Sequence, residues 1–254
     1  MSSGPLPAVT PVQKDSRLAD EVSGFVAQLQ DTIELTLKGI QGPLKTEVSP
    51  TGKLTVTTKN KAGIPLTVDD SEVLTLKLHY HCAWDSTKQF LAVDASSFAV
   101  TLPGVTEPLL HFDYIRKPQS RIPGAHINVH GHRDELVFAM LVAGKKFRGK
   151  NRVKGVLDGK VPRLADLHFP VGGSRFRPCL EDILQMLIYE FGIDTETGWQ
   201  DVLEDGRRVW KDNQLGAAVR DNPTKAVQQL EIMGFKIDPP DSWPDMKTAK
   251  LNEY

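Results

Sequence analysis

The hydrophobic period of this 254-residue chain changes twice along its length. Between residues 44 and 133, apolar residues alternate with polar ones, which is the two-residue period of half-buried β-strands. The alternation predicts six or seven strands in an antiparallel meander with one face on a core. Six groups of residues follow this pattern: Leu54 and Val56; Leu74, Leu76, Leu78 and Tyr80; Leu91 and Val93; Phe98 and Val100; Leu110 and Phe112; and Ile127 and Val129.

Helical periodicity flanks this segment on both sides. Apolar residues recur at helical spacing over about 15–38, and again over 180–191 and 198–221. A further helix is expected from Pro223, because Asn222 before it is a favourable N-cap. An N-terminal helix, then strands, then a segregated set of helices predicts an α+β fold rather than a doubly wound α/β sheet.

Composition divides the chain into four expected parts. Residues 1–13 are rich in proline, serine and glycine, which predicts a mobile tail. Residues 14–177 are expected to form a helix-plus-sheet domain and residues 178–237 a C-terminal helical subdomain. Residues 238–254 are expected to form an extended tail.

The start of the chain and the cysteine content bear on localisation. The chain begins without the basic and apolar regions of a signal peptide, and no apolar run approaches the roughly 18 residues of a membrane helix. The two cysteines, Cys82 and Cys179, have no metal-like spacing. We therefore expect a cytoplasmic protein without a membrane partner.

A formal net charge of −1 conceals an uneven distribution of charge. Residues 114–177 hold 14 basic and 4 acidic side chains, whereas the segments before and after them have net charges of −4 and −7. Such a chain is not a generally basic nucleic-acid binder, but its middle segment can attract an anion locally.

Basic side chains of this middle segment gather at two glycine-containing stretches. Gly144–Lys154 has six cations and no acid, which predicts a loop that contacts a phosphate backbone or is simply solvated. Val171–Pro178 combines Gly-Gly with two arginines before a helix, which predicts an anion site or only a turn with positive φ. The candidate ligand-binding residues are Arg116, Arg133, Lys145, Lys146, Arg148, Lys150, Arg152, Lys154, Arg175 and Arg177.

Six of the seven histidines fall within the expected strands, each opposite the apolar face of its strand. If these strands are neighbours in one sheet, the imidazoles gather on one side of it. A solvated face of a half-exposed sheet would explain the same alternation. The candidate catalytic residues are His130, His132, His79, His81 and Asp113.

Two chemistries fit such a histidine group, and the sequence does not choose between them. His130 and His132, with a partner from an adjacent strand, would complete a three-ligand site for a divalent metal such as zinc. Alternatively, two histidines would act as general base and general acid, with Arg116 or Arg133 stabilising a phosphorane-like charge. The sequence therefore leaves the cofactor unknown, with a divalent metal such as zinc as one candidate.

Several passages resemble other groups of proteins. His111–Tyr114 followed by Ala125–His132 resembles the core of small prokaryotic toxins of the TumE-like type, which have an Asp-bearing strand followed by a histidine-rich strand. His168–Pro178 and Trp210–Phe235 look like segments of uncharacterised actinobacterial proteins. The first resemblance implies a bacterial toxin-antitoxin setting.

These observations lead to one functional hypothesis and one alternative. The hypothesis is a toxin-antitoxin or phage-defence protein that binds or cleaves RNA or another phosphate-bearing ligand at the histidine-rich face, as a nuclease or other phosphodiester-acting hydrolase. The alternative is a non-catalytic antitoxin or assembly subunit that binds a protein partner through the helices after residue 178.

Overall fold

A computed structural model describes most of the chain and defines its secondary structure. It describes residues 16–48, 53–85, 88–118, 122–131, 141, 147–161, 163–166, 168–171, 173, 175–238, 240–242 and 245–252. The strands are β1 (Leu44–Val48), β2 (Leu54–Thr58), β3 (Ile64–Val68), β4 (Ser71–Trp84), β5 (Leu91–Thr101), β6 (Leu110–Ile115), β7 (Ala125–Val129) and β8 (Phe169–Pro170). The helices are α1 (Ser16–Thr36), α3 (Phe147–Leu157), a 3-10 turn η1 (Leu164–Asp166), α4 (Leu180–Phe191), α5 (Trp199–Asp221), α6 (Pro223–Ile232) and α7 (Thr248–Leu251).

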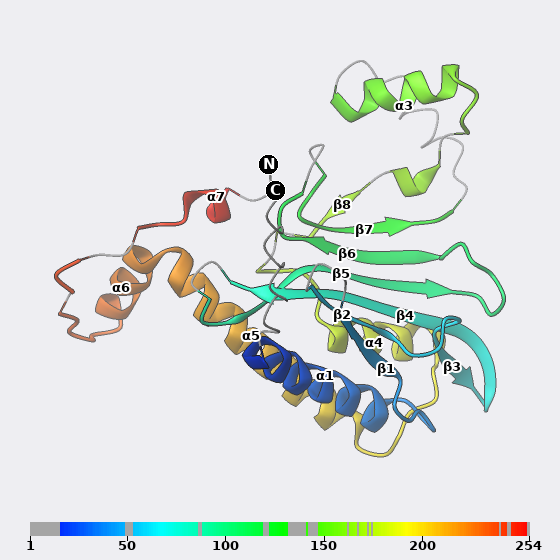
Figure 1. Ribbon diagram of the computed structural model, residues 1–254, viewed down its shortest axis with the longest axis horizontal. Coiled ribbons are helices and arrows are strands. Elements are labelled where there is room, and N and C mark those ends of the chain that lie inside the picture. The colour runs from blue at the N-terminus through cyan, green and yellow to red at the C-terminus, as the bar shows by residue number, and fades with distance from the viewer. Residues whose placement is uncertain are drawn as a thin grey trace, which may run out of the picture.

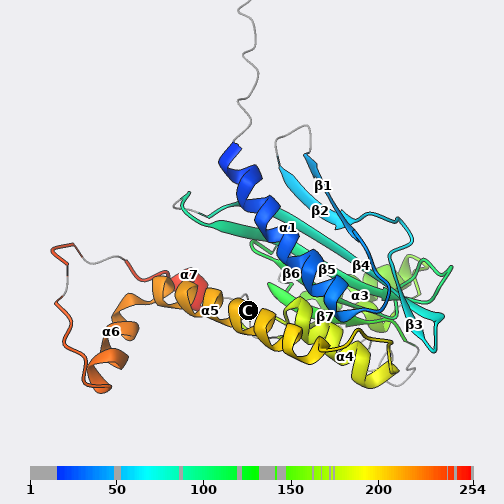
Figure 2. The same cartoon turned by 90° about the horizontal axis from the view of Figure 1, so that it is seen from below.

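The strands form one antiparallel sheet, which confirms the predicted α+β fold. The eight-stranded sheet has the order β1-β2-β4-β5-β6-β7-β8, and β3 pairs with β4 beside this path. Helices α1, α4 and α5 gather on one side of the sheet (Figures 1 and 2). Antiparallel neighbours joined by short connections suit a chain whose alternation is interrupted by frequent turn residues.

The long strand β5 contains both Leu91 with Val93 and Phe98 with Val100, which the alternation pattern lists as two separate groups. Val93 pairs with Cys82 and Ala95 pairs with His81, so Asp94 is an extra residue in this strand. A β-bulge of this kind shifts the alternation by one residue. This explains why the apolar positions change from odd numbers before the bulge to even numbers after it.

A single hydrophobic core joins the sheet to the helices of both ends of the chain. It therefore extends across residue 178, where composition suggested a boundary between two parts. Buried members include Val22, Leu29 and Ile33 of α1; Leu74, Leu76 and Leu78 of β4; Phe98 and Val100 of β5; and Leu184 and Leu187 of α4.

The opposite surface of the sheet is polar, and we call it the histidine face. In β4, Leu78 and Tyr80 are buried in the core, whereas His79 and His81 between them are half-buried on the other side. The same alternation continues through the neighbouring strands in register. The histidine face carries His79, His81, His111, Asp113, His126 and Asn128.

Two segments have more helix than the sequence pattern indicates. Residues 147–154 of the basic stretch were expected to form a loop, but they belong to α3. Lysine and arginine are good helix formers, and one glycine weakens a helix without ending it. Near the C-terminus, α7 follows Lys247, whose backbone N–H donates to the carbonyl oxygen of Asp221 at 2.8 Å.

The C-terminal half of α5, together with α6, extends away from the sheet (Figures 1 and 2). Only Leu203 and Asp221 are buried in α5, and no residue of α6 is. Among the described residues, no helix combines the length and apolar content required for a membrane span.

Leu184→Ala tests whether the helices and the sheet share one core. Leu184 is fully buried, so its truncation is expected to lower the free energy of unfolding by about 2–5 kcal/mol. Calorimetry should show one transition for the whole protein, moved to lower temperature. Leu215→Ala is the control, because Leu215 is 64% exposed and should change stability by less than about 0.5 kcal/mol. A second, unshifted transition would contradict a shared core.

Candidate functional site

Cross-strand pairing aligns polar side chains in rows across the histidine face. The longest row contains Lys45, Thr57, His79, Ser97, Asp113 and His126, each directly opposite the next. Adjacent strands are about 4.8 Å apart, so His79 and Asp113, with one strand between them, are about 10 Å apart. The predicted gathering of histidines on one side therefore occurs, but it does not bring them all to one point.

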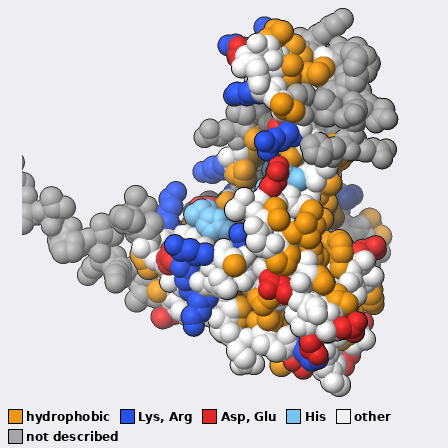
Figure 3. Space-filling view, turned by 90° about the vertical axis from the view of Figure 1, so that its right-hand side faces the viewer, with side chains coloured by type: hydrophobic (Ala, Val, Ile, Leu, Met, Phe, Trp, Pro, Cys, Tyr) orange, Lys and Arg blue, Asp and Glu red, His pale blue; other side chains and the backbone are white. Residues whose placement is uncertain are grey.

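The six histidines within the described ranges form three pairs of imidazole rings. The ring centroids are 4.4 Å apart for His79 and His81, 4.8 Å for His111 and His130, and 4.6 Å for His126 and His168. Figure 3 shows histidine side chains at the surface, with lysine and arginine side chains beside them. The remaining histidine, His132, lies outside the described residues.

His79 and His81 of β4 form the pair nearest the β1 edge of the sheet. The Nδ1 atom of His81 lies 3.2 Å from the hydroxyl oxygen of Thr55. Burial lowers the pKa of His79, and the charge of a protonated His81 lowers it further. His79 therefore favours its neutral form.

Asp113 links the other two pairs. Its Oδ2 atom lies 3.5 Å from Nδ1 of His111 and 3.8 Å from Nε2 of His126. Burial of the carboxyl group opposes ionisation, but hydrogen bonds from His111 and Ser97 outweigh it, so the pKa of Asp113 is lowered. Asp113 is thus an anion that orients imidazoles on either side.

His126 is held more tightly than the other histidines. Its side chain is 4% exposed, and Nδ1 lies 3.0 Å from the carbonyl oxygen of Pro123. A carbonyl oxygen only accepts hydrogen bonds, so Nδ1 is the donor and Nε2 faces Asp113. Asn128, also buried, donates to the carbonyl oxygen of Ala165 at 2.8 Å. The segment around η1 therefore covers this end of the histidine face.

His130 lies beside the carboxylate of Glu107. Its Nδ1 atom lies 3.5 Å from Oε1 of Glu107, and the same oxygen accepts from Nη1 of Arg163 at 3.0 Å. The Nε2 atom of His130 is buried and has no hydrogen-bond partner among the described residues. His111 with Asp113 and His130 with Glu107 are therefore two imidazole–carboxylate pairs side by side.

The metal hypothesis gains no geometric support from the described ranges. In them, no group of three or more histidine, cysteine, aspartate or glutamate side chains is arranged to hold a metal ion. The proposed pairing of His130 with His132 stays a prediction, because His132 is not among the described residues. Neither cysteine is a suitable nucleophile, since burial raises the pKa of Cys82 to about 12 and that of Cys179 even further.

The predicted ligand-binding cations are distributed over different parts of the molecule. Lys150, Arg152 and Lys154 lie on α3, and Arg148 is placed there by its backbone alone. Arg133, Lys145 and Lys146 lie outside the described residues. The four arginines Arg116, Arg152, Arg175 and Arg177 line one cavity on the core side of the sheet.

Arg116 does not take the place expected for it beside the histidines. It lines the cavity, and its Nη1 atom lies 3.0 Å from Oδ1 of Asp94, the bulged residue of β5. Arg163 is instead the described arginine tied to the histidine network, through Glu107. The sequence did not predict a role for Glu107 or Arg163, because both lie in loops without hydrophobic periodicity.

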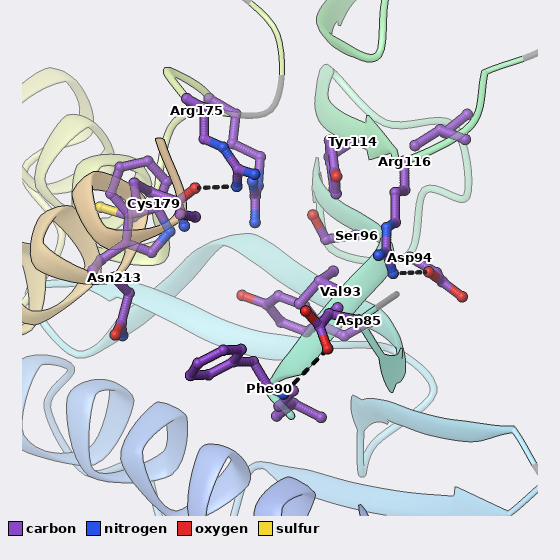
Figure 4. Close-up of a pocket in the computed structure, with 18 of the residues that line it drawn as sticks. Asp85, Phe90, Val93, Asp94, Ser96, Tyr114, Arg116, Arg175, Cys179 and Asn213 are labelled. Carbon is purple, nitrogen blue, oxygen red and sulfur yellow. Dashed lines mark hydrogen bonds and ion pairs between the residues drawn. The ribbon is translucent and has the colours of Figure 1, made fainter. Parts of the chain in front are cut away.

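The sequence predicted four arginines of this cavity as ligand-binding residues, but it did not predict the cavity itself. The cavity encloses about 2300 Å³. Figure 4 shows residues from β4, β5, β6, α5 and the 175–179 segment around it. Because these residues are distant in sequence, no local motif marks the site.

Comparison with known proteins identifies no protein similar to this chain. No known protein-family profile matches this chain, and neither a curated protein nor a solved structure matches it.

His81→Gln is expected to raise the pKa of His79 but to leave it below its ordinary value of 6.5. The substitution removes the charge of His81, whereas burial, the larger cause, remains. NMR titration of the His79 ring measures this pKa. Because the folded-state pKa is the lower one, the unfolded chain binds more protons, and wild-type stability should fall as pH drops below 6.5. An unchanged or lower His79 pKa in the variant would contradict the coupling.

Proposed function

We propose that this protein cleaves RNA by acid–base catalysis at the His111–His130 pair. One observation supports this choice above the others. Two partly exposed imidazole rings lie 4.8 Å apart, and each has a carboxylate oxygen 3.5 Å from its Nδ1 atom. Two oriented imidazoles are the minimum set for moving a proton onto and off a phosphodiester.

The reaction needs one neutral and one protonated ring. The neutral imidazole removes the proton of a ribose 2′-hydroxyl, and the 2′-oxygen bonds to phosphorus. The bond between phosphorus and the 5′-oxygen breaks, and the imidazolium gives its proton to that leaving oxygen. The products are a 2′,3′-cyclic phosphate and a 5′-hydroxyl, and proton exchange with water restores both rings.

The carboxylates act as positioning residues in this scheme. Asp113 and Glu107 face the Nδ1 atoms of His111 and His130, so the Nε2 atoms are directed away from them. The Nε2 atom of His130 is buried in the free protein, so the proposal requires that RNA binding uncovers it. A carboxylate at Nδ1 also stabilises the imidazolium that forms when the ring accepts a proton. Arg163, 65% exposed and 3.0 Å from Glu107, is a cation placed to meet an equatorial phosphate oxygen.

The proposed setting is a bacterial toxin-antitoxin or phage-defence system in the cytoplasm. RNA cleavage suits such a role, and the resemblance of His111–Tyr114 and Ala125–His132 to TumE-like toxins favours it. Lysine and arginine side chains beside the surface histidines provide a favourable field for a phosphate backbone (Figure 3).

A second candidate function rests on the projecting C-terminal helices. Large apolar side chains of α5, α6 and the turn after α6 face solvent: Leu215 is 64%, Ile232 75%, Met233 65% and Phe235 58% exposed. Exposed apolar clusters of this kind mark protein interfaces. A non-catalytic antitoxin or assembly subunit would use this surface and would need no acid–base pair.

His111→Ala and His130→Ala are each expected to slow cleavage of a single-stranded RNA by about 10²–10⁴-fold. Cleavage of a labelled oligoribonucleotide, followed by gel electrophoresis and mass spectrometry, measures the rate and identifies the cyclic phosphate. Because the imidazoles need no metal, EDTA should leave the rate unchanged. A 2′-deoxy substitution at the cleaved position should abolish cleavage.

His81→Ala is the matched control, since His81 lies on the same face but in a different pair. Its rate should stay within about twofold of the wild type. If His111→Ala and His130→Ala retain full activity, or if the wild-type protein cleaves no RNA, the proposal fails and the interaction function becomes the better one.

A further inference from the structure

The large cavity combines arginines with aromatic rings on the side of the sheet opposite to the histidine face. The histidine pairs use the odd-numbered positions of β4 and β6, whereas the cavity uses even-numbered positions such as Tyr80 and Tyr114. The sheet therefore separates the two sites. The aromatic residues at the cavity are Phe25, Tyr80, Trp84, Phe90, Phe98, Tyr114 and Trp210.

Arg177 lies among the aromatic rings of this cavity. Its guanidinium carbon is 4.1 Å from the ring centroid of Tyr114 and 5.8 Å from that of Trp210. At another part of the wall, the guanidinium of Arg220 lies 4.3 Å from the ring centroid of Phe90. Planar cations beside ring faces form surfaces on which a nucleobase stacks.

Two further arginines are fixed in place by carboxylates. Arg175 donates from Nε and Nη2 to Oδ2 of Asp221 at 2.9 and 2.7 Å, and Asp221 is itself buried. Arg116 donates to Asp94 at 3.0 Å on the other side of the cavity. Figure 4 shows the two arginines drawn on different sides of the opening. Anchoring of this kind lowers the entropic cost of binding an anion.

Charge is unevenly distributed around the cavity. Among the described residues, six acidic ones line it: Asp20 and Glu21 of α1, and Asp85, Asp94, Glu181 and Asp221. The eight cations of the described ranges that line it are Arg116, Lys117, Arg152, Arg175, Arg177, Arg220, Lys247 and Lys250. Asp94 pairs with Arg116, and Asp221 pairs with Arg175 and Lys247. A phosphate backbone is therefore favoured along the cationic side and disfavoured beside α1.

The size of the cavity favours a ligand larger than a single small molecule. Its volume of about 2300 Å³ exceeds the roughly 300–1,000 Å³ that is usual for a small-molecule site. A ligand of several linked units fills such a space better than one mononucleotide does. Asn213 and Gln214, which also line the cavity, offer amide donors and acceptors for base edges.

We propose that this cavity is a second nucleic-acid site, which binds a single-stranded segment of several nucleotides. The phosphates lie along the arginine side, and bases stack on the half-buried guanidinium of Arg177 and the half-buried ring of Trp210. The site goes beyond the proposed cleavage function, because the sheet lies between it and the histidine pairs. The cavity holds the nucleic-acid strand in place and catalyses no reaction.

Binding of a fluorescein-labelled oligothymidylate about eight nucleotides long, measured by anisotropy, tests this proposal. DNA lacks the 2′-hydroxyl, so the probe binds without being cleaved, and failure of the cleavage proposal does not affect the result. Arg177→Gln and Trp210→Leu are each expected to weaken binding by about tenfold, since they remove stacking and charge. Arg177→Lys should lie between wild type and Arg177→Gln, because it keeps the charge and loses the planar group.

Arg208→Gln is the matched control, because Arg208 is exposed, pairs with Asp205 on α5 and lies outside the cavity lining. Its affinity should stay within about twofold of wild type, as should that of His111→Ala. Circular dichroism confirms that each variant is folded. For wild type, log affinity should fall by about 0.7 per log unit of salt for each phosphate bound.

Three outcomes would overturn the proposal. The first is no binding of the oligothymidylate by the wild-type protein, and the second is Arg177→Gln and Trp210→Leu binding like wild type. The third is displacement of the probe by polyglutamate as effectively as by unlabelled oligothymidylate, because that would indicate an acidic-peptide site instead.

Discussion

Burial of one face of β4 against α1 and α4 is the constraint on which the rest of the structure depends. Leu76, Leu78 and Tyr80 are buried in the shared core, and this fixes the phase of the longest strand. A slip of one residue would place His79 and His81 in the core and expose the leucines. Because β2, β3 and β5 all pair with β4, its phase determines which side chains reach either face of the neighbouring strands.

Two chemically different surfaces follow from this single sheet. On the outer side, cross-strand pairing places Asp113 between two imidazoles. His111 pairs with Asn128 in the adjacent row, and its ring lies beside that of His130, which follows β7. On the inner side, the same strands end in aromatic residues that meet Arg177 and the C-terminal helices. The bulge at Asp94 affects both surfaces, since it shifts the alternation of β5 by one residue, and the Asp94 carboxylate lies 3.0 Å from Arg116.

The sequence was sufficient to predict the features that depend on local periodicity. It predicted the helix that begins the fold, the antiparallel sheet, and the opposite sides taken by Leu78 and His79. It did not predict the bulge in β5, because a bulge needs the register of a partner strand. Glu107 and Arg163 were missed because they reach His130 from loops, and the cavity was missed because its walls come from distant segments. The basic stretch was interpreted as a loop from its glycines, although its lysines and arginines are compatible with α3.

The central claim is that His111 and His130 act as one unit. A double-mutant cycle on the rate of RNA cleavage tests it most directly, with His111→Ala, His130→Ala and the double variant compared with wild type. The account predicts that the double variant is little slower than the slower single variant, because either loss already disables the pair. A double variant slowed by the full product of the two single effects would show that the histidines act independently, and would contradict the account.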